Sequence, residues 1–360
     1  MSAARAHLTA IAFAPRPAGG DAERAAREYC AGVLGSIGCK VTEHPFDYSA
    51  FPGRWGTPIA GVLTAILFLA SGHLGAHGNA RAALGVLLAG AAVLGLCAWW
   101  LGRWGVLDLP FGRASGTNLV ATRGAPAMWL VAHLDSKSQP IPIGVRAAAI
   151  TACIALWLAA TVLSIAQRFA GAPAQLWYLM TGLGVLAALP VIASVVGARS
   201  AGALDDASGV VTVLRTAELM PAHVSIGVLL TSAEELGLAG ARAWAREAAR
   251  ASAINIDGID DSGGIRLVYS GRKPRALLGQ LGAGWESASR LPPGLLMDGV
   301  ALADAGWHVV NVSRGSWRTV SRIHTPRDDL SHLDGSGIEE VAAMLAASMA
   351  AHTSVEQEFQ

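Results

Sequence analysis

Four long apolar runs dominate the pattern of hydrophobic and polar positions along the chain. They cover roughly residues 57–76, 82–101, 147–166 and 176–197, and none of them contains Asp, Glu, Lys or Arg. Each is close to the roughly 20 residues that an α-helix needs to cross the hydrocarbon layer of a membrane. Because the runs come in two close pairs, they predict two transmembrane hairpins, at 53–104 and 141–199, rather than buried helices of a soluble domain.

A different pattern marks the rest of the chain. Short β-branched runs stop at polar residues in WLVAHLDS (129–136), LLTSAEELGL (229–238) and INIDGIDDSG (254–263), which predicts buried strands. GIEEVAAMLAASMAAHTS (337–354) predicts a closing amphipathic helix. Without the hairpins about 250 residues remain, which suits a single α/β domain made of segments 1–52, 105–140 and 200–360.

Composition agrees with this division. Of the 360 residues, 52% are hydrophobic and 15% are charged, whereas soluble domains average about 25% charged residues. A net charge of +1 without a basic cluster argues against nucleic-acid binding. The four cysteines show neither metal-binding nor redox spacing, which favours a reducing compartment.

Five potential metal ligands follow one another at the ends of the apolar runs or in loop-like segments: His133, Asp205, Glu235, Asp257 and His324. Each has an ordinary alternative. His133 and Asp135 could be a hydrogen-bonded pair, Glu234 and Glu235 could begin a helix, and Asp205 and Asp206 could form a turn before a helix from Ser208. Asp257 could simply end a strand, and His324 could be a loop histidine. Their common context at strand ends, where open α/β sheets bind ligands, favours a metal site.

This series resembles the co-catalytic di-zinc exopeptidases of the bacterial leucyl aminopeptidase type, a family that also includes glutamate carboxypeptidase-like members. The resemblance covers nearly all of the chain outside the hairpins. It includes PRPAGGDAERAAREYCAGVLGSIGCKVTEHPFDYS (15–49), GTNLVATRG (116–124) and MDGVALADAGWHVV (297–310). It implies a mixed central sheet flanked by helices, a zinc-exopeptidase-like fold that carries the four transmembrane helices as insertions.

The resemblance also implies a role for each residue. Asp205 would bridge two zinc ions, His133 and Asp257 would complete one site, and Glu235 and His324 would complete the other. Nitrogen and oxygen ligands with few thiolates suit zinc. Glu234 would be the general base, and the carboxylate of Asp135 would hold the His133 imidazole. A cis peptide bond is expected between Asp205 and Asp206.

The sequence departs from the family at two places. The family's late Ser-Asp-His is Met297-Asp298-Gly299 here, which leaves the role of Asp298 open. The tyrosine that some members place near the oxyanion has only one candidate, Tyr269, whose residue type alone suggests the role. Within IRLVYSG, Tyr269 fits a strand residue better.

The distribution of charges, together with Trp55, Trp99, Trp100 and Trp104 clustered at the same boundary, predicts the topology of an integral protein of the bacterial inner membrane. An even number of spans puts all globular segments on one side. That side carries Arg54, Arg103, Arg113, Lys137, Arg146 and Arg199 near the spans, whereas the opposite turns carry only Arg81 and Arg168. The positive-inside rule makes the side of the catalytic domain cytoplasmic. The first 20 residues also lack the apolar region of a signal peptide.

Three functions remain open from the sequence. The first is an aminopeptidase that removes N-terminal residues from peptides. The second is an amidohydrolase that acts on a membrane-presented or lipid-linked amide, because both hairpins are expected to leave the sheet at its active-site edge. The third is an inactive receptor or scaffold, although the five ligands and Glu234 are all present. The lipid bilayer is an expected partner in each case, and the oligomeric state stays open.

Overall fold

The computed structural model describes residues 2–282, 285, 288–292 and 294–358. The chain divides into two compact units: Met1–Ala50, Leu107–Ser138 and Gly197–Gln360 form the globular unit, and Phe51–Val106 and Gln139–Val196 form the helical unit. The boundaries expected from the sequence, after residues 52, 104, 140 and 199, lie close to these.

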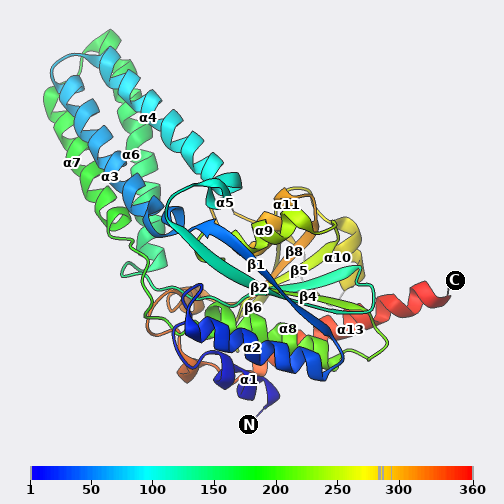
Figure 1. Cartoon of the computed structure of the whole chain (residues 1–360). Helices are drawn as coiled ribbons and strands as arrows, with labels where there is room; N and C mark the ends of the chain where they lie inside the picture. Colours follow the sequence, from blue (N-terminus) through cyan, green and yellow to red (C-terminus); the bar gives the residue numbers. More distant parts are fainter. Residues whose placement is uncertain (1, 283–284, 286–287, 293, 359–360) are drawn as a thin grey trace. The chain divides into compact units, whose positions relative to one another are not determined.

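An eight-stranded mixed sheet forms the centre of the globular unit (Figure 1), with the strand order β1-β2-β4-β3-β5-β8-β6-β7. The strands are β1 (Lys40–Ser49), β2 (Arg113–Arg123), β3 (Met128–His133), β4 (Ile226–Thr231), β5 (Ser252–Ile259), β6 (Gly264–Tyr269), β7 (Ser289–Arg290) and β8 (His308–Gly315). The β-branched runs identified in the sequence are β3, β4 and β5, and most of their side chains are buried on both faces of the sheet.

Strand direction determines where polar residues gather. β3 pairs in parallel with β4 and β5, and β5 pairs in parallel with β8. β2 is antiparallel to both β1 and β4, so β1 runs in the same direction as this parallel group. The carboxyl ends of β1, β3, β4, β5 and β8 therefore share one edge of the sheet.

Helices cover both faces of this sheet. One face packs against α1 (Ala3–Ile11), α2 (Asp21–Ser36), α8 (Ser208–Leu219), α10 (Arg275–Leu281) and α13 (Ser336–Glu358), which share its larger hydrophobic core. The other face packs against α9 (Ala239–Glu247) and α11 (Asp298–Asp304). The expected fold class, a mixed sheet flanked by helices, is confirmed. The short helix α1 was not predicted from the sequence.

Short helical turns complete the described chain: η1 (Leu101–Gly105) and α5 (Val106–Asp108) follow α4, η2 (Ala203–Ala207) precedes α8, and α12 (Trp317–Val320) and η3 (Leu330–His332) follow β8.

The helical unit consists mainly of four long helices, α3 (Phe51–Ala76), α4 (Ala80–Trp100), α6 (Ile143–Ala170) and α7 (Ala174–Ile192). Together with the turns that follow α4, they give four candidate spans that are long and apolar enough to cross a membrane, judged by length and composition. α7 ends five residues before the predicted limit of 197. Pro190 lies inside α7 without ending it.

Glycines allow the two hairpins of the helical unit to pack closely. A Cβ atom at Gly72 would lie 1.8 Å from Thr181 Oγ1, and one at Gly75 would lie 2.1 Å from Trp177 Cε2. These contacts join α3 to α7, one helix from each hairpin. Small residues at such positions are typical of helix interfaces in membranes.

Candidate metal centre

The sheet edge at the carboxyl ends of the strands brings all the predicted site residues together. His133 is the last residue of β3, and Glu234 and Glu235 lie in the turn between β4 and α9. Asp205 lies in η2, directly before α8, and His324 lies in the loop after α12. The alternative in which Glu234 and Glu235 begin a helix is wrong, because α9 starts only at Ala239.

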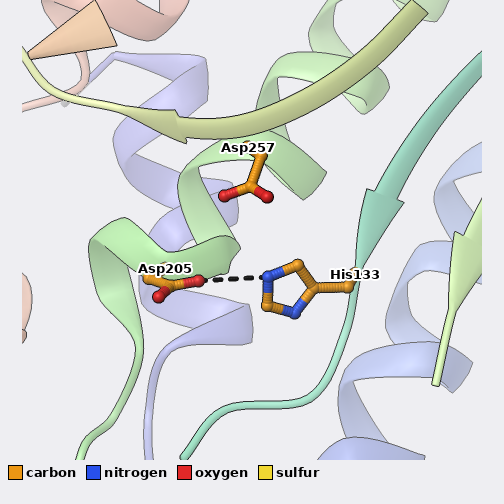
Figure 2. A group of neighbouring side chains, drawn as sticks. All are labelled: His133, Asp205 and Asp257. Carbon is orange, nitrogen blue, oxygen red and sulfur yellow. Dashed lines mark hydrogen bonds and ion pairs between the residues drawn. The ribbon is translucent and has the colours of Figure 1, made fainter. Parts of the chain in front are cut away.

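Two groups of side chains share Asp205. His133, Asp205 and Asp257 form one group (Figure 2), and Asp205, Glu235 and His324 form the other. Within each group, one ligand atom from each residue lies within 4.8 Å of the others. The Nε2 atom of His133 is 3.1 Å from Asp205 Oδ1, and the Nε2 atom of His324 is 3.0 Å from Asp205 Oδ2. The two oxygens of Asp205 therefore face different histidines, as a bridging carboxylate requires.

Asp257 reaches the site from within a strand. The register of β5 against β8 shifts between Ile256 and Ile259, and Gly258 has a φ of 76°. Such a bulge turns a side chain away from the regular alternation of a strand. The alternative in which Asp257 simply ends a strand is therefore wrong.

Asp206 and Asp328 hold the backbone around Asp205. The carboxylate of Asp206 accepts hydrogen bonds from the backbone N–H groups of His133, Gly209 and Gly258, at 3.2, 2.9 and 3.1 Å. That of Asp328 accepts from the N–H groups of Leu204 and Asp205, at 2.6 and 3.2 Å. The peptide bond between Asp205 and Asp206 is cis, as expected. Asp206 thus ties together the segments that carry His133, Asp205 and Asp257.

Asp135 differs in detail from the expectation. Its backbone carbonyl, rather than its carboxylate, lies 3.0 Å from His133 Nδ1, while the nearest carboxylate oxygen is 3.6 Å away, beyond a good hydrogen bond. The carboxylate instead accepts the backbone N–H groups of Glu234 and Glu235, at 3.1 and 3.2 Å. Asp135 therefore orients the imidazole through its main chain and the two glutamates through its side chain.

Two basic residues belong to the site although the sequence did not assign them to it. Lys137 Nζ lies 2.5 Å from Glu235 Oε2. The guanidinium of Arg16 is fully buried and donates to the backbone carbonyls of Leu134, Ala201 and Gly202. Arg16 thereby holds the loop after β3 against the segment before η2.

Burial of several carboxylates dominates the electrostatics of the site, and the charges of neighbouring groups add to or oppose its effect. Burial raises the pKa of Glu234 well above its ordinary value, although the nearby charge of His133 opposes this shift. Burial, and then the charge of Asp205, raise the pKa of Asp257 to about 7. Burial also acts to raise the pKa of Glu235, but Lys137 and His324 outweigh it and bring the value to about 2. Carboxylates packed this closely need cations to stay ionised together.

The donor atoms fit a metal. Glu235 Oε1 lies 3.1 Å from His324 Nε2, yet it is buried without a hydrogen-bond partner among the described residues. Two ligand atoms that approach each other without hydrogen-bond geometry can instead point at a common ion. The set consists of two imidazoles and three carboxylates, which suits zinc.

The sequence left the roles of Asp298 and Tyr269 open. Asp298 is buried at the start of α11, where the hydroxyl of Thr231 donates to its Oδ2 atom, and its Oδ1 atom has no partner among the described residues. Its charge acts on Glu234 and Asp257, so it lies beside the site. Tyr269 is the last residue of β6, as the strand alternative predicted.

A comparison with known families finds one match in the second half of the chain. Residues 189–349 match the model described as peptidase family M28. This match, which covers less than half of the chain, supports a zinc metallopeptidase and makes that segment similar to the M28 peptidases. The matched segment contains Asp205, the two glutamates, Asp257 and His324, whereas His133 precedes it. No curated protein matches the sequence.

Several solved structures have the same fold as this chain. An aminopeptidase from Aneurinibacillus sp. strain AM-1 is 14% identical, with a TM-score of 0.55 over 96% of this chain and 92% of that one. A glutaminyl cyclase from Fimbriiglobus ruber is 15% identical, with a TM-score of 0.54 over 96% and 93%. BSAP, a zinc aminopeptidase from Bacillus subtilis, is 13% identical, with a TM-score of 0.52 over 98% and 94%. At these identities the likeness shows the fold alone.

Proposed function

We propose that the protein is a membrane-embedded aminopeptidase with two zinc ions, which removes N-terminal residues from peptides. The observation that carries this proposal is the pair of ligand groups that share Asp205, with Glu234 beside them. His133, Asp205 and Asp257 would hold one zinc ion, and Asp205, Glu235 and His324 would hold the other. When bound, the ions would polarise the scissile carbonyl and activate a water molecule.

The protein's own residues would move the proton and fix the geometry. Glu234 Oε2 lies 4.0 Å from His133 Nε2, so the carboxylate reaches the shared site. As general base, Glu234 would take a proton from the attacking water and pass it to the leaving amine. Burial raises its pKa, which makes it a stronger base for this step. Asp135 would keep Glu234 and Glu235 in place through their backbone N–H groups.

Membrane insertion is supported by the four apolar helices and by their flanking residues. The candidate spans meet the length and composition of membrane-crossing helices. Arginine and lysine are concentrated on the side of the globular segments, which favours a cytoplasmic catalytic unit in the inner membrane. Trp99, Trp100 and Trp104 at the end of α4 and in η1 are exposed, as expected for residues at a membrane interface.

A second candidate substrate is an amide presented by the membrane. The observation that favours it is the place of the second insertion, which begins directly after Lys137 and Ser138 in the chain, next to the site segment. The reaction and the residues would be the same. The candidates differ only in whether a water-soluble peptide is hydrolysed.

The test is an assay of the detergent-purified protein after zinc loading. The substrates are aminoacyl amides, the same amides with an acetylated amine, and peptides with N-terminal glutamine, for which cyclisation is followed separately. We expect hydrolysis of the free-amine amides and a loss of at least 100-fold in Glu234→Gln. The control is Glu28→Gln, an exposed residue of α2, which should retain full activity.

Three results would change the proposal. Turnover only after reconstitution with lipid-linked amides would favour the second candidate. Cyclisation of glutaminyl peptides without hydrolysis would replace the peptidase assignment. Zinc binding without turnover of any of these substrates would favour the inactive scaffold.

A further inference from the structure

Lys137 places a fixed positive charge in direct contact with Glu235, a residue of only one of the two ligand groups. Its Nζ atom contacts Glu235 Oε2 at 2.5 Å, while Glu235 Oε1 faces His324. The two oxygens of Glu235 thus have different partners: Oε2 contacts the ammonium group of Lys137, and Oε1 faces the imidazole of His324.

The chain holds Lys137 firmly in this position. The backbone N–H of Ser136 donates to the carbonyl of Arg16, and its hydroxyl donates to the carbonyl of Ser200. On the other side, Ser138 and Gly197 exchange two backbone hydrogen bonds of 2.8 and 2.7 Å. Lys137 is 18% exposed as a side chain, and so little contact with water leaves its charge poorly screened.

The other ligand group has a different electrostatic environment. The leading charges that act on Asp257 are those of Asp205, His133, Glu235 and Asp298, which are three carboxylates and an imidazole. The leading charge that acts on Glu235 is the ammonium of Lys137. A fixed cation beside a site weakens the binding of a second cation there, because the two repel each other at low screening.

We propose that Lys137 makes the two zinc positions unequal: the position formed by His133, Asp205 and Asp257 fills first, and the position formed by Asp205, Glu235 and His324 binds zinc more weakly. This inference rests on the proposed function, because it assumes that both groups bind zinc. Lys137 is in this sense a positioning residue. It fixes Glu235 to one oxygen and sets the affinity of the second position.

Direct zinc binding tests the inference without an activity measurement. The full chain in detergent is stripped of metal and titrated with zinc against a chromogenic chelator, and the stoichiometry is checked by elemental analysis. We expect two binding events whose dissociation constants differ at least tenfold, the scale on which outer residues change metal affinity. His324→Ala should remove the weaker event, and His133→Ala should remove the tighter one.

Variants of Lys137 then separate charge from other effects. Lys137→Met keeps most of the side-chain volume without the charge, so the dissociation constant of the weaker zinc position should fall at least tenfold. Lys137→Arg keeps the charge and should therefore keep the difference between the two zinc dissociation constants. Lys40→Met is the control, because Lys40 is exposed at the start of β1, and it should leave both constants unchanged.

The possible results of the zinc titration distinguish a failure of this inference from a failure of the proposed function. Two equal events in the unaltered protein, or a weaker second event in Lys137→Met, would overturn the role of Lys137 and leave the proposed function standing. Loss of the tighter event in His324→Ala would overturn the assignment of the weaker position. A protein that binds no zinc would overturn both this inference and the proposed function.

Discussion

Asp135 offers a direct test of how the site is built, because its carboxylate holds the backbone of Glu234 and Glu235 in place. Its two carboxylate oxygens accept the N–H groups of Glu234 and Glu235, and the side chain is almost completely buried. The substitution Asp135→Asn preserves the shape. It replaces one acceptor oxygen with an NH₂ group, which cannot accept a hydrogen bond.

The expected cost follows from these two hydrogen bonds. A hydrogen bond to a charged group contributes about 1.5–3 kcal/mol, and a buried N–H group left unpaired costs about 1–3 kcal/mol. One bond is lost in the variant and the other becomes neutral, so we expect a loss of about 2–4 kcal/mol in the free energy of unfolding. For a domain of this size, that lowers the Tm by about 5–10 °C.

The assay combines thermal unfolding with kinetics. Because both bonds lie within the protein, the decrease in Tm should persist after zinc is removed with a chelator. kcat/KM should fall by about 10–100-fold, since the general base and one ligand both lose their support. The control is Asp47→Asn, an exposed residue of β1 that accepts a hydrogen bond from Ser115 Oγ at 2.7 Å. If Asp135→Asn behaved like this control in both measurements, the bonds to the two glutamates would not organise the site.

Three further predictions concern packing, pH and metal. Gly75→Ala should lower the Tm in detergent by the equivalent of about 1–3 kcal/mol, because its Cβ would overlap Trp177, whereas Gly85→Ala, with no atom within 4 Å of the added Cβ, should be neutral. Burial raises the pKa of Cys30 from 9.0 to about 12; the unfolded chain ionises first, so stability should fall as the pH rises above about 9, with a smaller slope in Cys30→Ala when chemical unfolding is followed against pH. Zinc at 100 times its dissociation constant should stabilise the protein by about 2.7 kcal/mol, and a chelator should reverse the Tm increase; an unchanged Tm would exclude metal binding to the folded state.

Three of the five ligands could be predicted from the sequence because they have a local signal. His133 ends an apolar strand, Glu235 follows one, and Asp205 precedes the helix from Ser208. In a parallel sheet such positions converge at one edge whatever the loops between them. The four long apolar runs are equally local signals, which is why their helices could be located from composition.

The supporting residues could not be predicted in the same way. Asp206 and Asp328 act by accepting backbone N–H groups, and some of these partners lie more than 70 residues away in the chain. Any aspartate can accept such bonds, so nothing in the local pattern distinguishes these two. For Asp135, the spacing from His133 was informative, but it did not reveal whether the carbonyl or the carboxylate would face the imidazole. Lys137 was assigned to the membrane flank because a lysine before an apolar run is typical of one.

The way the insertions are joined explains how a metallopeptidase fold can carry them. At the first junction, the N–H of Ala50 donates to the carbonyl of Gly112 at 2.8 Å. At the second, Ser138 and Gly197 form an antiparallel bridge. Each insertion thus leaves and re-enters the globular unit at neighbouring backbone positions, so the sheet keeps its pairing whatever lies between them. The second junction also fixes Lys137. The same two hydrogen bonds that accommodate the second hairpin therefore hold the charge that we expect to divide the two zinc positions.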